Sequence, residues 1–195
     1  MARRSDHSRD ELREMAVNAG QEIIKNEGFS NFSARKVARN IGYTIGTIYN
    51  IFESHDDFIL HINIITLREM CGFIAENTTE TGEDAIKQMV SSYIKFAQND
   101  YNRWSALFEH VMPNNTPLPD WYDEEVKKIF LLVGSHFMAI TNDAEAAQMA
   151  SRTIWASVHG ICQLGMTGKL DIIGAQSIQE LTDSLIENYL KGIKL

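Results

Sequence analysis

Short polar side chains and one aromatic hydroxyl lie close together in the segment TIGTIYNIF, residues 44–52. Read as a helix, this segment keeps Ile48 and Phe52 on an apolar side. Its remaining surface would carry Thr44, Ile45, Gly46, Thr47, Tyr49 and Asn50. Hydroxyl groups and a helix N-terminus bind phosphates, an amide can hydrogen-bond the edge of a base, and a glycine lets a backbone come near. This set of side chains therefore supports binding in the major groove of double-stranded DNA.

Two short helices joined by a tight turn must position these groups. Ser33 can cap a helix that stops at Gly42, where glycine accepts a left-handed backbone cheaply, and Thr44 can cap the next helix. The apolar contacts that would hold the pair at a fixed angle come from Val37, Ala38, Ile41, Ile48 and Phe52. These dimensions are those of a helix-turn-helix. On pattern alone, an ordinary helical corner with polar residues facing water is the alternative.

The charge of the chain is unevenly distributed. The 195 residues carry a formal net charge of -8, yet residues 1–52 hold eight Lys or Arg against six Asp or Glu. Residues 53–195 then have a balance of -10. The acidic total argues against non-specific coating of nucleic acid, and the N-terminal quarter is the part able to approach a polyanion.

Helical patterns continue to the end of the chain without a convincing strand. Ser8 with Glu11 forms a capping box for a helix that runs to about Gly28. Later helices are expected near residues 33–42, 44–52, 54–77, from 81, 102–111, 119–140, 142–165 (started by Asn142) and 176–191. All three prolines fall between residues 113 and 119, in one predicted loop. The sequence therefore predicts an all-α protein with nine helices.

The bulk sequence disfavours a membrane or exported protein. The longest apolar run, Phe58–Ile65, is too short to span a bilayer, and the polar N-terminus lacks the apolar core of a signal peptide. Cys71 and Cys162 are isolated, have no metal-type spacing and are expected to be reduced and buried. We therefore expect a cytoplasmic protein that has no membrane partner, no metal and no cofactor.

The segment from about Arg9 to Phe58 resembles the DNA-binding domain of the TetR family of bacterial transcriptional regulators. The family signature has a Ser or Thr opening the second helix, an Arg two residues later, an apolar-Ala pair, a closing Gly and then Thr/Ser-x-Gly-Thr-x-Tyr-x-x-Phe. The matching residues are Ser33, Arg35, Val37, Ala38, Gly42, Thr44, Gly46, Thr47, Tyr49 and Phe52. The resemblance implies a three-helix helix-turn-helix domain at residues 1–53 and a helical ligand-binding and dimerisation domain at residues 54–195.

The resemblance also implies which residues contact DNA. They are Arg3, Arg4, Arg35, Thr44, Ile45, Gly46, Thr47, Tyr49, Asn50 and His55. Among them, Ile45 would meet a thymine methyl group and Asn50 an adenine, while the hydroxyls would bind phosphates. His55 stands where family members usually carry Lys, and the recognition helix has no basic residue. We therefore expect a weaker or more pH-sensitive hold on DNA than is usual in the family.

One helix in the C-terminal half has a sharper local resemblance. Residues 154–164, IWASVHGICQL, are similar to the pattern Trp-x-x-x-His-Gly-x-x-x-Leu of the WHG class within the family. The pattern is carried by Trp155, His159, Gly160 and Leu164. In the functional interpretation His159 forms part of an effector pocket. In the alternative it is a core histidine, hydrogen-bonded to a neighbouring backbone group or carboxylate where two helices cross.

The resemblance implies a small-molecule effector and a second copy of the chain as partners. A mostly apolar effector pocket is expected to involve Trp104, Phe108, Met112, Phe137, Trp155 and His159. A dimer interface on the last two helices is expected to involve Ile154, Val158, Ile161, Leu181, Leu185 and Tyr189. A homodimer would hold two heads roughly 34–36 Å apart and so require a palindromic operator.

The function that these expectations favour is a homodimeric TetR-type repressor, released from its operator by a small, mostly apolar effector. A helical sensor or carrier with a weakened DNA-binding head is the alternative, because the recognition helix lacks basic residues. An enzyme built on His110, His136, His159 and Cys162 is disfavoured, since a zinc site normally needs three or four ligands. Redox sensing by one of the two thiols is a further alternative.

Overall fold

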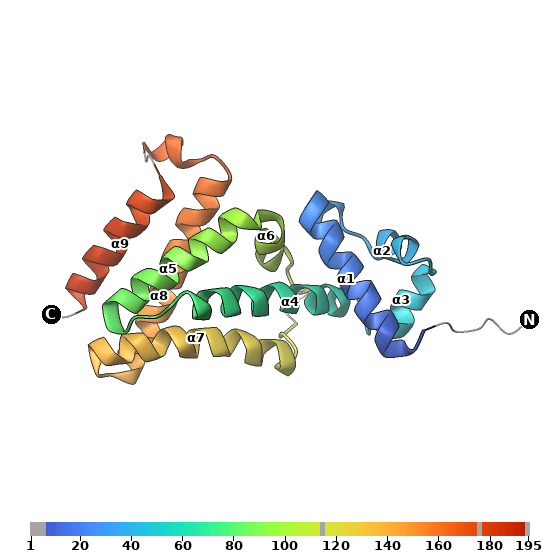
Figure 1. Cartoon of the computed structure of the whole chain (residues 1–195), viewed down its shortest axis with the longest axis horizontal. Helices are drawn as coiled ribbons and strands as arrows, with labels where there is room; N and C mark the ends of the chain where they lie inside the picture. Colours follow the sequence, from blue (N-terminus) through green and yellow to red (C-terminus); the bar gives the residue numbers. More distant parts are fainter. Residues whose placement is uncertain (1–6, 114–115, 175–176, 194–195) are drawn as a thin grey trace, which may run out of the picture. The chain divides into compact units, whose positions relative to one another are not determined.

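The computed structural model describes residues 7–113, 116–174 and 177–193. Within these ranges the chain forms nine α-helices and no strand, which confirms the all-α prediction (Figure 1). The helices are α1 (Arg9–Glu27), α2 (Ala34–Asn40), α3 (Ile45–Ile51), α4 (His55–Glu76), α5 (Gly82–Asn99), α6 (Tyr101–Glu109), α7 (Asp120–Thr141), α8 (Ala144–Met166) and α9 (Ile178–Gly192). The 3-10 turns η1 (Phe29–Asn31) and η3 (Leu170–Ile173) lie between helices.

The chain divides into two compact units. The first unit is Met1–Arg68 with Asp100–Tyr122, and the second is Glu69–Asn99 with Asp123–Leu195. The first unit thus contains α1–α3, the larger part of α4, and α6, whereas the second contains α5, α8, α9 and most of α7. The expected DNA-binding segment lies entirely in the first unit, and the functional boundary at residue 53 stays a prediction.

Short polar side chains begin the helices of the first unit where the sequence predicts them. The Ser8 hydroxyl accepts a hydrogen bond from the backbone N–H of Glu11, whose carboxylate accepts the N–H of Ser8 at 2.6 Å. Ser33 accepts in the same way from the N–H of Lys36 at 3.2 Å. These caps satisfy donors that the first turn of a helix leaves without a partner.

The start of α8 differs from the prediction by one residue. The sequence predicts a cap at Asn142, but the cap in the structure is Asp143. Its Oδ1 accepts from the N–H of Glu145 at 2.8 Å and of Ala146 at 3.3 Å. Asn142 has a φ of 52°, a left-handed conformation that asparagine adopts more readily than most residues. Asn142 therefore makes the turn between α7 and α8 and does not cap the helix.

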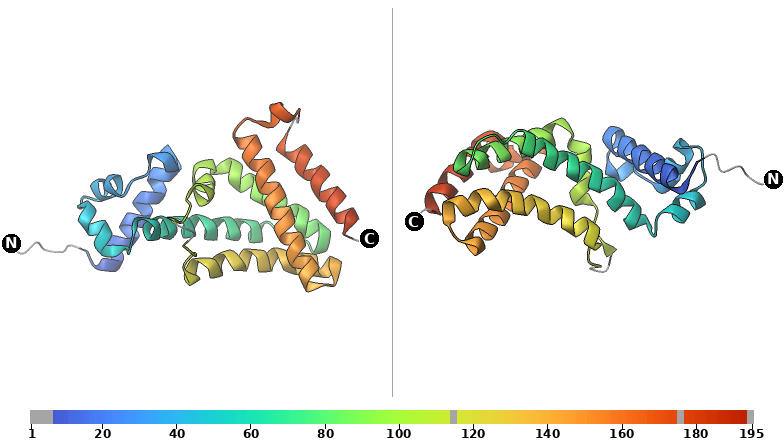
Figure 2. Two further views of the ribbon diagram at one scale, coloured as in Figure 1. Left: turned by 180° about the vertical axis from the view of Figure 1, so that it is seen from behind. Right: turned by 60° about the horizontal axis from the view of Figure 1, so that its bottom comes forward.

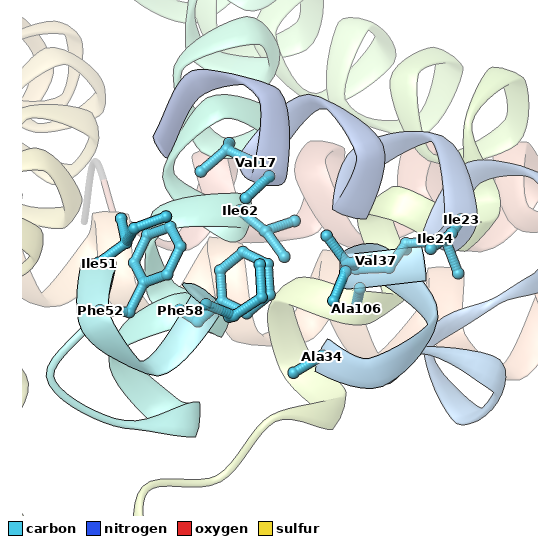
Figure 3. Close-up of a cluster of buried hydrophobic side chains, with 13 residues drawn as sticks. Val17, Ile23, Ile24, Ala34, Val37, Ile51, Phe52, Phe58, Ile62 and Ala106 are labelled. Carbon is cyan, nitrogen blue, oxygen red and sulfur yellow. The ribbon is translucent and has the colours of Figure 1, made fainter. Parts of the chain in front are cut away.

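Apolar side chains from α1–α4 and α6 form the core of the first unit (Figure 3). Val37 of α2 and Ile48 of α3 are both 0% exposed. Phe58 of α4 is also fully buried, and its ring centroid lies 4.3 Å from that of Phe52. Because close-packed interiors tolerate little movement, this packing fixes the angle between α2 and α3.

A buried polar network within the first unit connects α1 to α4 and α6. The side-chain amide of Gln21 donates to the backbone oxygen of Ile62 at 2.5 Å and to Oγ1 of Thr66 at 3.0 Å. Its carbonyl oxygen accepts from Arg103 of α6 at 2.8 Å, and Arg103 forms an ion pair with Asp100. A buried polar group with its partners in place favours one packing arrangement over others. The network therefore specifies how α1 sits against its two neighbours.

In the second unit, α8 and α9 lie side by side and antiparallel (Figure 2). Gly165 allows their close approach, because a Cβ atom built there would lie only 2.3 Å from Cγ1 of Ile178. Glycine at position 165 is therefore required for α8 and α9 to pack this closely.

Helix α4 contributes to both units and is strongly apolar. By length and composition alone it could cross a membrane, but 56% of the qualifying stretch is buried inside the protein. Such burial is what a core helix of a folded domain requires. We therefore interpret α4 as a core helix.

Candidate DNA-binding surface

The turn between α2 and α3 is a helix end that requires glycine. Gly42 has a φ of 77°, which only glycine adopts without steric cost. The N–H of Tyr43 donates to the oxygen of Ala38 at 2.8 Å, and the N–H of Gly42 donates to the oxygen of Arg39 at 3.2 Å. These are the two bonds of a Schellman motif. Helix α2 therefore ends in a tight turn at Gly42 and Tyr43, which leads directly to Thr44 at the start of α3.

Helix α3 has one buried side and one accessible side. Ile48 and Ile51 are 0% and 3% exposed, whereas Ile45 and Tyr49 are 36% and 49% exposed. Of the other predicted contact residues on this helix, Thr44, Gly46 and Asn50 are exposed and Thr47 is half-buried. Each of the six predicted α3 contacts thus keeps accessible surface, on a helix that Ile48 and Ile51 fix in the core.

Thr44 begins α3 through its backbone, not through the side-chain cap that the sequence predicts. The N–H of Thr47 donates to the carbonyl oxygen of Thr44 at 3.0 Å, while the Thr44 side chain makes no cap bond. Instead, its Oγ1 lies 3.2 Å from Oγ1 of Thr47. The two hydroxyls are therefore adjacent at one end of the accessible side, where both could donate to a phosphate oxygen.

Gly46 is not required by the packing of the chain itself. A Cβ atom at this position would find its nearest neighbour, Oγ1 of Thr44, at 3.6 Å, which is an ordinary contact. Glycine inside a helix costs roughly 1 kcal/mol relative to alanine. The internal structure offers no compensation for this cost. The free space lies on the accessible side of α3, where it would admit an external backbone.

Two arginines that sequence reasoning did not select hold the end of α3. Arg9 and Arg13 both donate to the backbone oxygen of Ile51, at 3.3 and 3.2 Å. Arg13 also lies 5.6 Å from the centre of the Phe52 ring and 3.3 Å from Nε2 of His61. Cations near a helix C-terminus stabilise its free carbonyls. The spacing of four residues in the sequence indicates that Arg9 and Arg13 share one face of α1. That both reach the carbonyl oxygen of Ile51 depends on tertiary packing, which the sequence does not show.

The remaining predicted contacts flank α3. Arg35 on α2 is exposed, and so is Arg39 one turn later, which sequence reasoning did not select. His55 is exposed at the start of α4. The other two predicted contacts, Arg3 and Arg4, lie outside the described residues. Helix α2 thus carries exposed positive charge that could attract phosphates, whereas α3 has no basic residue.

A family model described as "Tetracyclin repressor-like, C-terminal domain" matches residues 86–189, which is more than half of the chain. The protein belongs to the TetR family of transcriptional regulators. TetR proteins are DNA-binding regulators and not enzymes, so the enzyme hypothesis is set aside. The finer resemblance to the WHG class stays a prediction.

Solved structures share the fold. A protein of unknown function from Rhodococcus sp. RHA1 has a TM-score of 0.74 at 15% sequence identity, with 100% of both chains covered. A TetR transcriptional regulator from the same organism has a TM-score of 0.64 at 16% identity, covering 95% of this chain and 97% of that one. BioQ, solved with its double-stranded DNA operator, has a TM-score of 0.62 at 15% identity, covering 90% and 98%. A comparison with curated proteins finds no match.

In the TetR C-terminal region, an aromatic cluster surrounds His159. The Trp155 ring stacks on His159 at a centroid distance of 5.4 Å, and Phe130 of α7 meets Trp155 edge-on at 5.7 Å. Nδ1 of His159 lies 2.9 Å from the hydroxyl oxygen of Tyr93 on α5. The histidine thus connects α8 to α5 through a tyrosine hydroxyl, not through the backbone group or carboxylate that the core interpretation expected, and its role in binding an effector stays a prediction.

The predicted effector-pocket residues fall in both units. Trp104, Phe108 and Met112 belong to the first unit, and Phe137, Trp155 and His159 belong to the second. Trp104 and Phe137 are 0% exposed. Both are core residues in this conformation, and their contact with an effector stays a prediction.

The predicted dimer-interface residues also divide into two groups. Ile154 and Val158 are each 3% exposed within a single chain. They are core residues within the single chain, and their contact with a second copy stays a prediction. Ile161, Leu181, Leu185 and Tyr189 are half-buried, and their contact with a second copy stays a prediction.

Both thiols are poor nucleophiles in the folded protein. Burial raises the pKa of Cys71 to about 11, with a contribution from the Glu125 carboxylate, and burial raises the pKa of Cys162 to about 12. Because the thiolate is the reactive form, we expect both to react with DTNB at pH 7.5 on the order of 100-fold more slowly in the native protein than in guanidinium. A native thiol that reacts at the unfolded rate would revive the redox-sensor hypothesis.

Acid should destabilise the protein through two half-buried histidines, His110 and His159. Burial lowers the pKa of His159, and burial also lowers the pKa of His110 against the opposing effect of Asp56. The unfolded chain gains these protons below about pH 6.5 while the folded chain resists them, so the free energy of unfolding should fall from pH 7 to pH 5. Urea titrations should show a shallower fall in His159→Asn than in wild type or in Tyr93→Phe. Equal slopes in all three proteins would contradict this assignment.

Proposed function

We propose that this TetR protein is a homodimeric transcriptional repressor of the cytoplasm, which binds a palindromic operator through α3. The observation that carries the proposal is the accessible side of α3. It presents two adjacent threonine hydroxyls, an exposed tyrosine, an asparagine and a glycine that the packing of the chain does not require. The helix itself is held in the core by Ile48 and Ile51. These are groups that bind phosphates and read base edges in the major groove.

The contact residues would divide into two kinds. Thr44, Thr47 and Tyr49 would bind phosphates, which sets the register on the duplex without reading the sequence. Ile45 and Asn50 would read bases, the first by apolar contact with a thymine methyl group and the second by hydrogen bonds to adenine.

A small, mostly apolar effector would release the operator. The aromatic cluster of Phe130, Trp155 and His159 in the second unit supports this part of the proposal, since such side chains form the apolar walls of ligand sites. Release requires that the effector bind the DNA-incompetent state more tightly than the competent state. An effector with equal affinity for both would have no effect.

Selection of bound duplexes from a random DNA pool tests the proposal. We expect the wild-type protein at about 50 mM salt, where phosphate contacts are strong, to enrich a palindromic sequence. No enrichment by a folded protein would contradict DNA recognition and favour a sensor or carrier that uses only its C-terminal region.

A further inference from the structure

One imidazole in the first unit, that of His61 on α4, lies between a guanidinium and a carboxylate. Nη1 of Arg13 lies 3.3 Å from Nε2 of the ring. On the opposite edge, Nδ1 lies 2.8 Å from the backbone oxygen of Asp57 and 3.2 Å from Oδ1 of the same residue. The side chain of His61 is 22% exposed, so protein groups and not water surround most of the ring.

These contacts determine the protonation state of the ring. An arginine side chain can only donate hydrogen bonds, so Nε2 of His61 must accept from Arg13 and carries no proton. Both oxygen atoms of Asp57 that lie near Nδ1 are acceptors, so Nδ1 must carry the proton and donate it. The imidazole is therefore neutral in this arrangement, with its proton on Nδ1.

The same guanidinium holds the end of α3. While Nη1 of Arg13 donates to His61, Nη2 donates to the backbone oxygen of Ile51, the last residue of α3, at 3.2 Å. The guanidinium is a rigid planar fork, so its nitrogens cannot move independently of one another. Helix α3 has only seven residues, and a helix this short depends on tertiary contacts for its stability and position. A change at Nε2 of His61 is therefore transmitted to the C-terminal end of α3.

A second proton on the His61 ring is incompatible with this arrangement. Nε2 would become a donor that faces the donors of Arg13, and two cations would lie next to each other in a partly buried position. The carboxylate of Asp57 would at the same time stabilise the charged ring. The uncharged rings of Phe52 and Trp121 also pack on the imidazole, at centroid distances of 5.4 and 4.7 Å. The ring can therefore accept the proton only if the guanidinium moves away, and the guanidinium then also leaves the end of α3.

We propose that His61 is a positioning residue for DNA binding, whose neutral form holds the end of α3 through Arg13 and whose protonation releases that end and weakens operator binding. The inference rests on the proposed function, since it concerns the helix that would enter the major groove. Arg9 donates to the same oxygen of Ile51 at 3.3 Å and has no hydrogen bond to His61 within the described part of the chain, so its hold on α3 does not depend on this proton. Protonation of His55 would instead add a cation near a phosphate and strengthen binding, so the two histidines predict opposite responses to acid.

Operator affinity as a function of pH tests the inference. In His61→Gln the introduced amide oxygen can accept from Arg13 at every pH, because an amide does not titrate. Between about pH 7.5 and about pH 5.5, wild type should lose affinity relative to His61→Gln by on the order of 10-fold, since apparent affinity falls with the fraction of molecules in the competent state. The other histidines, including His55, are present in both proteins, so their effects cancel in this ratio. A ratio that does not change with pH would overturn the proposal.

Two arginine variants separate this mechanism from a general loss of stability. Arg13→Met removes the group that links His61 to Ile51, so it should bind the operator more weakly than wild type and lose the part of the acid response that depends on His61. The matched control is Arg9→Met, which removes a donor to the same oxygen but keeps the link to His61. It should also bind more weakly, yet keep the acid response of wild type. Equal acid responses of the two variants, compared at pH values where circular dichroism shows both to be folded, would contradict the mechanism.

A measurement without DNA separates this inference from the proposed function. Long-range nitrogen–proton NMR spectra distinguish the neutral tautomers of a histidine, and His61 should carry its proton on Nδ1 near neutral pH. The amide nitrogen of Phe52 shares a peptide bond with the Ile51 oxygen, so its signal should shift on protonation of His61 more in wild type than in Arg13→Met. A proton on Nε2, or equal shifts in the two proteins, would overturn the inference. A protein with the expected tautomer and shifts that selects no DNA would leave the contact between His61 and Arg13 intact and contradict the repressor function.

Discussion

Tyr49→Glu should reduce operator affinity by at least about 100-fold while leaving the protein folded. Tyr49 is 49% exposed on the accessible side of α3, so the substitution disturbs little of the core. It removes a hydroxyl that would bind a phosphate and places a carboxylate next to the phosphate backbone. A lost hydrogen bond to a charged group costs about 1.5–3 kcal/mol, to which the repulsion of like charges adds. Fluorescence anisotropy with the selected duplex measures the change.

The matched control is Ser184→Glu, which adds the same charge on the exposed face of α9 in the second unit. We expect it to bind the operator as wild type does, because none of the predicted DNA contacts lies on α9, and surface charges more than about 10 Å apart are largely screened at 0.1 M salt. If both variants lose affinity equally, net charge and not α3 governs binding. If neither does, α3 does not contact the operator.

Trp104→Ala should lower the free energy of unfolding by about 3–5 kcal/mol, the usual cost of removing a large buried aromatic side chain. Trp104 is 0% exposed, and its ring centroid lies 5.5 Å from that of Phe108 and 6.0 Å from that of Tyr101. The substitution therefore leaves a cavity inside the first unit. Urea unfolding followed by circular dichroism measures the loss.

Trp121→Ala is the matched control, since this tryptophan is 37% exposed in the same unit. It buries less of its surface and should cost less stability. If Trp104→Ala costs no more stability than Trp121→Ala, the assignment of Trp104 to the core is contradicted.

The helices could be predicted from the sequence because their signals are local. Capping residues such as Ser8 and Ser33, and the glycine at position 42, set helix ends through bonds to neighbours within a few residues. Where two adjacent residues could both cap, as with Asn142 and Asp143, local pattern did not decide between them. The accessible face of α3 was predictable for the same reason, since its buried positions follow helical periodicity.

The parts that the sequence did not predict depend on contacts between distant segments. Nothing local to Gln21 or Arg103 indicates that their side chains meet, because the pair is separated by 82 residues. Likewise, an apolar stripe on one helix looks the same whether it faces the core or a partner. Ile154 and Val158 belong to the core, and Leu131 does not, for reasons that only the packing of neighbouring helices reveals.

Hydroxyl-radical footprinting on the selected duplex tests the central claim most directly, namely that two copies of α3 read DNA together. The account predicts two protected patches on one face of the duplex, about 10–10.5 base pairs apart from centre to centre, as two-fold-related helix-turn-helix heads require. Both patches should disappear together in Tyr49→Glu. A single patch, or a protection pattern that persists in Tyr49→Glu, would contradict the claim.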